Sequence, residues 1–396
     1  MSHFDQLIDR TGLETVKQAY TPDVINTSGH ISMWGAEFEF PTAPFVTEAL
    51  AEWAKKGLYG YTVPTEDFWQ CIADWMDFHR NWQIRTDWIV PVYGITSSVA
   101  TTMRAFTEEG DGIIGFSPGY HMYWEAVEWS NRRKVPSPLL YENGTFRIDW
   151  EDLEAKMADP RNKILLVCNP NNPTGTVYSP EDLRRIAELA VKYDVILYND
   201  EIFAECLYDG VEFKTFNQVA GNDLKVITAT SIGKWLSFTG ANQANLIIPN
   251  DELREAFIAE RNREFYGSYQ PPLIPATRAA YTPEGERWLS EMMAYVQENY
   301  RMVDAFFREY LPEFRAVKPD GTYILWVDAQ DFCGRQFGGD DAKFEDFLVN
   351  KAYFHMDIGT RYGDETGFFR MALCIPRAEL RRNLESLRTA VGELQK

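Results

Sequence analysis

The sequence predicts an α/β fold: a large three-layer α/β/α domain with a mostly parallel sheet, and a smaller α+β domain. Between about residue 88 and residue 248, short apolar strands alternate with amphipathic helices, the pattern of a parallel sheet covered on both faces. From about residue 286 this alternation stops. We therefore expect the large domain to span residues 48–285, and residues 1–47 and 286–396 to form the small one.

In the first region, apolar runs predict five strands, at residues 87–92, 112–116, 163–168, 195–198 and 224–228. One helix between them is well marked, because Ser179 is a natural N-cap and Pro180 suits the first helical position. In the last region we expect a helix over 285–310, strands near 322–327 and 367–373, and a closing helix from Pro376.

The composition excludes several classes of protein. The net charge of −20 would repel nucleic acid and anionic lipid, so neither is an expected partner. The five cysteines are scattered along the chain, which argues against a disulfide framework. The five histidines do not have the spacing of metal ligands, so no metal site is predicted. No signal peptide or membrane-spanning run is recognisable, so we expect a cytoplasmic protein.

Polar residues follow the predicted strands at their carboxyl ends, where open α/β sheets bind ligands. If the sheet is parallel, all of them reach one edge. They are Thr96 and Ser97, Tyr120, Asn172, Asp200, Ser231 and Lys234.

This set suits pyridoxal phosphate. Lys234 can form an imine with the cofactor aldehyde, and Asp200 can keep the pyridine nitrogen protonated. The turn at 94–97, with Ile95 and Thr96, offers backbone N–H groups to the phosphate, and Tyr120 offers a ring for stacking.

Each of these residues also has an ordinary structural explanation, since a lone lysine is usually on the surface and Asn-Pro-Thr-Gly can be a simple turn. Their order on three successive strand ends favours the cofactor site. Ser231-Ile232-Gly233-Lys234 also matches the S-x-x-K motif of penicillin-recognising enzymes. That chemistry needs a later Lys-Thr-Gly, whereas this chain has only Lys214-Thr215-Phe216, upstream.

The motifs at 172–175 (Asn-Pro-Thr-Gly), 200–202 (Asp-Glu-Ile) and 231–234 resemble the class I/II aminotransferase superfamily of fold-type I pyridoxal-phosphate enzymes. The whole chain, from Phe4-Asp5 to Pro376-Arg377, is most similar to the MalY/PatB-type cystathionine β-lyases. The resemblance implies an aspartate aminotransferase-like fold.

The resemblance also implies roles for individual residues. Lys234 would be the imine lysine and proton carrier, Asp200 the pyridinium partner and Tyr120 the stacking ring. Asn172, before an expected cis proline, would bind the phenolic oxygen, and Ser231 the phosphate. Arg370 matches the arginine that binds the substrate α-carboxylate. Tyr61 resembles a tyrosine that reaches the neighbouring subunit's phosphate, which implies a homodimer with shared active sites.

Several positions depart from the family pattern. Phe203 replaces the usual tyrosine or histidine, and Asn242 the arginine often found eight residues after the lysine. The segments Gly35–Phe40 and Gly233–Ser237 also differ. These positions lie near the expected substrate pocket, so they bear on the reaction.

The resemblance favours a C–S β-lyase that converts cystathionine or cysteine into a thiol, pyruvate and ammonia through a quinonoid. An aminotransferase acting between an amino acid and a 2-oxo acid is the alternative, because both reactions share every step up to that point. A non-catalytic regulator on this fold is a third hypothesis. It is disfavoured by the complete set of catalytic residues and by the absence of room for an N-terminal DNA-binding module.

Overall fold

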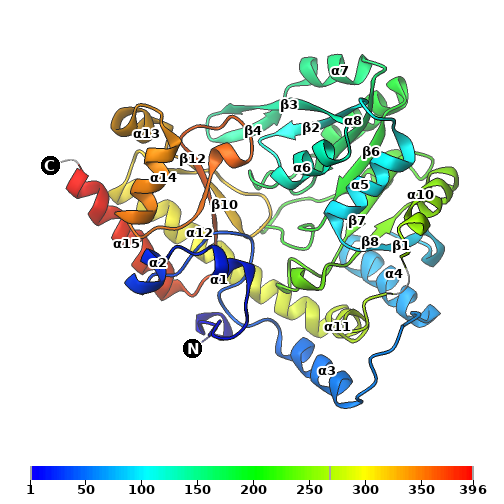
Figure 1. Cartoon of the computed structure of the whole chain (residues 1–396), viewed down its shortest axis with the longest axis horizontal. Coiled ribbons are helices and arrows are strands. Elements are labelled where there is room, and N and C mark those ends of the chain that lie inside the picture. Colours follow the sequence, from blue (N-terminus) through cyan, green and yellow to red (C-terminus); the bar gives the residue numbers. More distant parts are fainter. Residues whose placement is uncertain (1, 267–268, 395–396) are drawn as a thin grey trace.

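A computed structural model describes residues 2–266 and 269–394. Its strands form two sheets, with the orders β1-β8-β7-β6-β5-β2-β3-β4 and β11-β12-β10-β9 (Figure 1). The strands are β1 Ile89–Val92, β2 Gly112–Ser117, β3 Arg133–Glu142, β4 Thr145–Ile148, β5 Asn162–Cys168, β6 Ile196–Asp200, β7 Val226–Thr230, β8 Ala244–Ile247, β9 Arg315–Ala316, β10 Ile324–Asp328, β11 Asp357–Ile358 and β12 Phe368–Ala372.

The helices are α1 Val16–Tyr20, α2 Asp23–Ser28, α3 Pro44–Lys55, α4 Glu66–Arg80, α5 Ile95–Phe106, α6 His121–Trp129, α7 Trp150–Ala158, α8 Pro180–Tyr193, α9 Phe216–Ala220, α10 Asp251–Arg263, α11 Leu273–Ala280, α12 Pro283–Tyr310, α13 Gln330–Phe337, α14 Asp341–Asn350 and α15 Arg377–Leu394. At the start of α8, the predicted cap is present: Ser179 accepts a hydrogen bond from the N–H of Asp182.

The large sheet is mostly parallel, as predicted. Strands β3, β2, β5, β6 and β7 run parallel to one another, whereas β8 is antiparallel to both of its neighbours, β7 and β1. Because β1 and β7 both oppose β8, they point the same way, and the carboxyl end of β1 lies at the same edge as those of β5, β6 and β7.

Three strands of this sheet were missed by the sequence analysis: β3, β4 and β8. The first two alternate exposed and buried residues at the edge of the sheet, so they lack the continuous apolar run of a central strand. The third is only four residues long and follows a loop closely, so its pattern is too short to recognise.

Successive residues of the central strands face opposite layers, which gives the three-layer architecture. Ile113, Ile164 and Ile227 pack with residues of α5, α6 and α10 on one face. Ile114, Leu165 and Val226 pack with residues of α7 and α8 on the other. Both faces are apolar because both are covered by helices.

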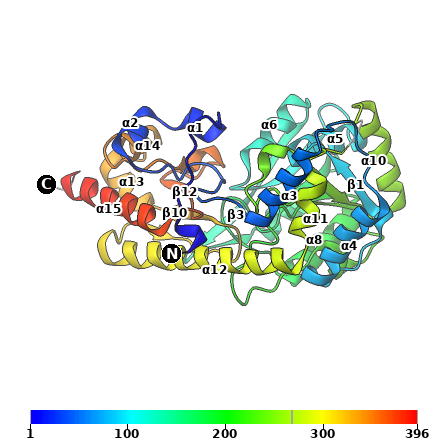
Figure 2. The same cartoon turned by 90° about the horizontal axis from the view of Figure 1, so that it is seen from below.

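The second sheet lies beside the first, and the long helix α12 runs along both regions (Figure 2). The N-terminal segment joins this second region: the N–H of Ala372 donates to the carbonyl of Met33, and the N–H of Glu39 to that of Cys374. This pairing agrees with an N-terminal contribution to the small domain, although the boundaries at 47/48 and 285/286 stay predictions. Among the described helices, none is long and apolar enough to cross a membrane.

Candidate active site

Three adjacent strands bring the predicted residues together at their carboxyl ends. In the sheet, Cys168 of β5 pairs with Asp200 of β6, which pairs with Ala229 of β7. The segments that follow these strands line a cavity of about 230 Å³. Its walls include all the predicted cofactor residues except Tyr61: Ile95, Thr96, Tyr120, Asn172, Asp200, Ser231 and Lys234.

The Lys234 amine is the only side-chain cation among the described residues lining this cavity. Burial lowers the pKa of Lys234 to about 8, and the positive charge of Arg370 adds to this effect. Part of the amine is therefore neutral near neutral pH, which makes it a competent nucleophile toward an aldehyde.

Asp200 is the buried carboxylate of the site, with 3% of its surface exposed. Burial raises the pKa of Asp200 to about 6, against the hydrogen bonds that it accepts from the Tyr123 hydroxyl and the Ile202 N–H. Sequence reasoning missed Tyr123. Its signal was its position in the first turn of the helix that begins after Tyr120, on the same side as the site.

Another part of the cavity lining suits a phosphate. Helix α5 begins there, and its first N–H groups lack intrahelical partners. Gly94 precedes it at φ 98°, a backbone conformation that favours glycine, and a Cβ at this position would also displace the Asn242 side chain, whose Oδ1 would lie 2.6 Å away. Ser231 lines the same cavity, and its hydroxyl donates to the carbonyl of Gln243 at 2.8 Å.

The chemistry of this donor set fits pyridoxal phosphate. A lysine with a lowered pKa, a buried carboxylate, a helix N-terminus and the Tyr120 ring all line one cavity of suitable size. As expected, the Asn172–Pro173 peptide bond is cis.

Arg370 lies on β12 and reaches the cavity through Asn172, with an Nη1–Oδ1 distance of 2.9 Å. Its Nη2 donates to Asp357 Oδ2 at 2.6 Å, and the guanidinium stands 4.8 Å from the centre of the Tyr362 ring. The sequence analysis did not identify Asp357, because nothing in its local sequence marks it as a partner of Arg370.

Tyr61 lies apart from the cavity and is 99% exposed. It belongs to the extended segment between α3 and α4 and contributes nothing to the site of its own chain. The proposed contact with a second subunit stays a prediction.

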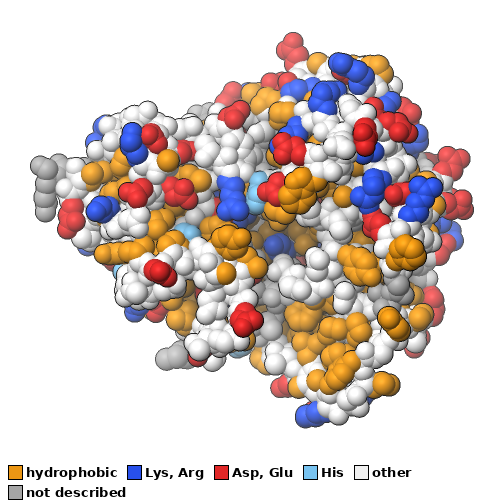
Figure 3. Space-filling view, in the orientation of Figure 1, with side chains coloured by type: hydrophobic (Ala, Val, Ile, Leu, Met, Phe, Trp, Pro, Cys, Tyr) orange, Lys and Arg blue, Asp and Glu red, His pale blue; other side chains and the backbone are white. Residues whose placement is uncertain are grey.

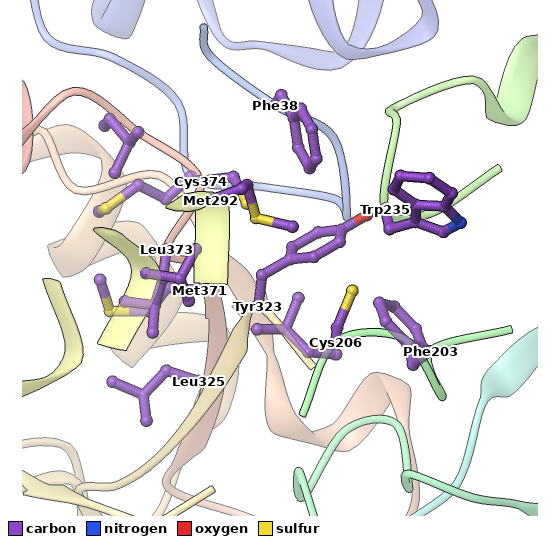
Figure 4. Packing of buried hydrophobic residues seen from close by; sticks show 14 of the residues in the cluster. Phe38, Phe203, Cys206, Trp235, Met292, Tyr323, Leu325, Met371, Leu373 and Cys374 are labelled. Carbon is purple, nitrogen blue, oxygen red and sulfur yellow. The ribbon is translucent and has the colours of Figure 1, made fainter. Parts of the chain in front are cut away.

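The departures from the family pattern cluster around Lys234. The Phe203 ring is buried, its centre 5.6 Å from the Lys234 Nζ, and it packs edge-on against Tyr323 (Figure 4). Phe38 packs against the same tyrosine, and its N–H donates to the Ser237 hydroxyl at 3.1 Å. The two unusual segments, Gly35–Phe40 and Gly233–Ser237, are thus in direct contact, and the second of them contributes Gly233 and Lys234 to the lining of the cavity.

Comparisons with known proteins identify the family of this chain. The family described as "Aminotransferase class I and II" matches residues 36–387. Cystathionine beta-lyase PatB of Bacillus subtilis is 29% identical over 98% of this chain and 100% of its own. The crystal structure of cystalysin from Treponema denticola, which contains a pyridoxal 5'-phosphate cofactor, has a TM-score of 0.92, 30% identity and complete coverage of both chains. The PLP-bound C-S lyase from Staphylococcus hominis has a TM-score of 0.91 and 25% identity, covering 99% of each chain. The chain belongs to the class I and II aminotransferase family.

Proposed function

We propose that this protein is a pyridoxal-phosphate-dependent C–S β-lyase that converts a sulfur amino acid, cystathionine or cysteine, into a thiol, pyruvate and ammonia. The observation that carries the proposal is the Lys234 amine, with a pKa of about 8, in one cavity with Asp200 and next to the buried Arg370. The likeness to cystathionine beta-lyase PatB and to the C-S lyase from Staphylococcus hominis, over nearly the whole chain, supports the choice of reaction.

When bound, the cofactor supplies an electron sink that acidifies the Cα proton of an attached amino acid. Lys234 would hold the cofactor, and its free amine would be the base that removes the proton at Cα. Asp200 accepts the pyridine N–H, and the Tyr123 hydroxyl fixes the orientation of that carboxylate.

The remaining wall residues bind and orient. Asn172 would donate to the phenolic oxygen, and the Tyr120 ring would stack on the cofactor. Ser231 and the N–H groups of Ile95 and Thr96 would hold the phosphate. Arg370 receives the substrate α-carboxylate, a task suited to its planar, forked guanidinium.

We also propose a homodimer with shared active sites, in which Tyr61 reaches the partner's phosphate. Apolar side chains gather on the face shown in Figure 3, in the part where Figure 1 places α3. Four of the exposed ones belong to the segment between α3 and α4: Leu58, Tyr59, Tyr61 and Val63. Sedimentation of the purified protein as a monomer would contradict this part of the proposal.

The cytoplasm is the compartment that we propose, because the five cysteines are free and suit a reducing environment. No nucleic acid or membrane is proposed as a partner.

An aminotransferase remains the second candidate, because the family includes that activity and the same cavity can serve it. The regulatory hypothesis has no support, since the full set of cofactor residues of one chain, Tyr61 apart, lines one cavity.

One experiment separates the two enzymatic candidates. Purified holoenzyme is incubated with cystathionine or cysteine, with and without a 2-oxo acid, and the Lys234→Ala protein is the blank. Pyruvate and thiol released without the 2-oxo acid support the lyase. Turnover that requires the 2-oxo acid, with transfer of the amino group to it, contradicts the lyase and identifies an aminotransferase.

A further inference from the structure

The buried Arg370 guanidinium already has a carboxylate partner within its own chain. Asp357 lies directly opposite Arg370 on the neighbouring strand, β11, and its Oδ2 is 2.6 Å from Nη2. Both side chains are almost fully buried, with 3% of Asp357 and 5% of Arg370 exposed. The pair is therefore shielded from solvent, and its electrostatic effect is strong.

The same Asp357 oxygen also accepts the backbone N–H of Gly35, at 3.0 Å. A guanidinium together with a backbone N–H is the kind of donor set that binds a carboxylate ligand. Burial alone would raise the pKa of Asp357, but the Arg370 charge, the hydrogen bonds from Arg370 and Gly35 and the Arg361 charge together outweigh it. The pKa therefore lies below its ordinary value and the carboxyl group is ionised. The ionised Asp357 carboxylate thus takes one of the two Nη groups of Arg370 that a substrate carboxylate would use.

The charges of Arg370 and Asp357 cancel. A substrate carboxylate that approaches this pair meets no net positive charge, and it is repelled by Asp357 at short range. The Nη1 group of Arg370 donates to Asn172, which lines the cavity, and its Nε has no hydrogen-bond partner among the described residues. A substrate carboxylate that takes the N–H group now given to Asp357 has to displace it.

Asp357 has a second cation to move toward. Its Oδ1 is 3.6 Å from Nη1 of Arg361, whose side chain is 43% exposed and stands 5.6 Å from the Trp34 ring. Both Asp357 and Arg361 border a separate hollow of about 450 Å³, which gives the carboxylate space in which to turn.

We propose that Asp357 is a specificity-determining residue that occupies the carboxylate position of Arg370 and swings toward Arg361 when a substrate carboxylate binds. This inference rests on the proposed function, because it takes Arg370 as the substrate-carboxylate receptor. It adds that the affinity of the site for a carboxylate is set by an internal competitor, and that Arg361 determines how readily the competitor leaves.

The test compares two ligands that differ only in the carboxylate. L-Alanine and L-alaninamide, neither of which has a leaving group on Cβ, are titrated into holoenzyme, and the visible absorption of the cofactor is followed. In Asp357→Asn we expect affinity for L-alanine to rise about tenfold or more, with little change for L-alaninamide. Asp364→Asn, an exposed site nearby, is the matched control and should leave both affinities unchanged.

Arg361→Met provides the reciprocal measurement. With its second cation removed, Asp357 should stay on Arg370, so affinity for L-alanine should fall about threefold or more. In the Asp357→Asn background the same Arg361→Met change should have no effect, since nothing is left to displace. Equal effects of Arg361→Met in both backgrounds, or a fall in L-alanine affinity in Asp357→Asn, would overturn the inference.

Failure of the proposed function gives a different result. If the wild-type protein shows no spectral response to either amine ligand, the amino-acid site itself is wrong. Thermal unfolding with and without acetate then decides the inference, because Asp357→Asn leaves Arg370 unpaired and should gain more in Tm from acetate than the wild type. An equal or smaller gain would contradict it.

Discussion

Two buried arginines of this protein are held in different ways. Arg80, at the end of α4, donates to Glu201 Oε2 at 2.6 Å and to Glu205 Oε1 at 2.5 Å, in a cluster that does not line the cavity. Arg370 donates to one carboxylate, Asp357, and to the amide oxygen of Asn172 at the cavity wall.

This difference separates a structural role from a ligand-binding one. The two carboxylates that hold Arg80 are 0% and 1% exposed, so no ligand can exchange with them. Arg370 is equally buried, but one of its partners lines the cavity and the other can reach a second cation. The cavity and the Arg80 cluster are adjacent in sequence, because Asp200 lines the cavity and the next residue, Glu201, pairs with Arg80.

The largest expected effect comes from the cavity. Lys234→Ala removes the group that holds the cofactor and carries the proton, so turnover should fall by about 10⁴-fold or more. The visible absorption of the bound cofactor should disappear as well. Because the amine does not pack against Arg80, the free energy of unfolding of the ligand-free protein, measured in urea, should change by less than about 1 kcal/mol. Residual turnover near the wild-type level would show that Lys234 is not the residue that holds the cofactor and carries the proton.

Breaking the cluster of Arg80, Glu201 and Glu205 should instead lower the stability of the protein. Arg80→Met leaves two buried carboxylates without a cation and should lower the free energy of unfolding by about 3–5 kcal/mol. Arg85→Met is the control, since its pairing with Asp87 is exposed and should be worth less than about 1 kcal/mol. If both changes cost the same in urea titrations, the Arg80 cluster has no special structural role.

The cluster of Arg80, Glu201 and Glu205 should also make the free energy of unfolding depend on pH. Burial raises the pKa of Glu201 to about 7, above the ordinary value of 4.5. A raised pKa in the folded state contributes stability that is complete below about pH 4.5 and is lost as the pH rises through about 7. In the ligand-free protein, Glu201→Gln should therefore flatten the decline in unfolding free energy over this range, by up to about 1.4 kcal/mol per pH unit.

The control for this pH profile is Glu142→Gln, at an exposed position. It should retain the wild-type slope between pH 4.5 and pH 7. Identical slopes in the wild type and in Glu201→Gln would show that Glu201 does not take up the proton.

The smallest effect concerns Phe203, whose ring lies 5.6 Å from the Lys234 Nζ. Without a hydroxyl at this position, the cofactor's phenolic oxygen would lack one hydrogen-bond donor. The protonated, yellow form of the imine with Lys234 should therefore persist into alkaline pH. Phe203→Tyr should move the midpoint of the absorbance titration down by about one pH unit. Bleaching of the wild-type holoenzyme at lower pH than the variant would contradict this expectation.

Much of the cofactor site could be predicted from the sequence because its residues follow strands directly. Asn172, Asp200 and Lys234 each come within six residues of a buried strand end, so a parallel sheet brings them to one edge. The same reasoning failed for Tyr123, whose contact with Asp200 depends on how α6 packs on the sheet. It failed equally for β3, next to the edge strand β4, whose alternating pattern differs from the apolar runs of the centre.

The sequence by itself determined the alternation of strands and helices, the order of the lysine, aspartate and asparagine, and hence the cofactor. These features follow from local hydrophobic patterns and from the direction of parallel strands. Only the tertiary structure decided which charges neutralise one another. Glu201 and Glu205 reach Arg80 across more than a hundred residues, and Asp357 meets Arg370 through the pairing of β11 with β12. Such pairs form because a buried charge requires a partner wherever the fold supplies one, and no local pattern records which residue that will be.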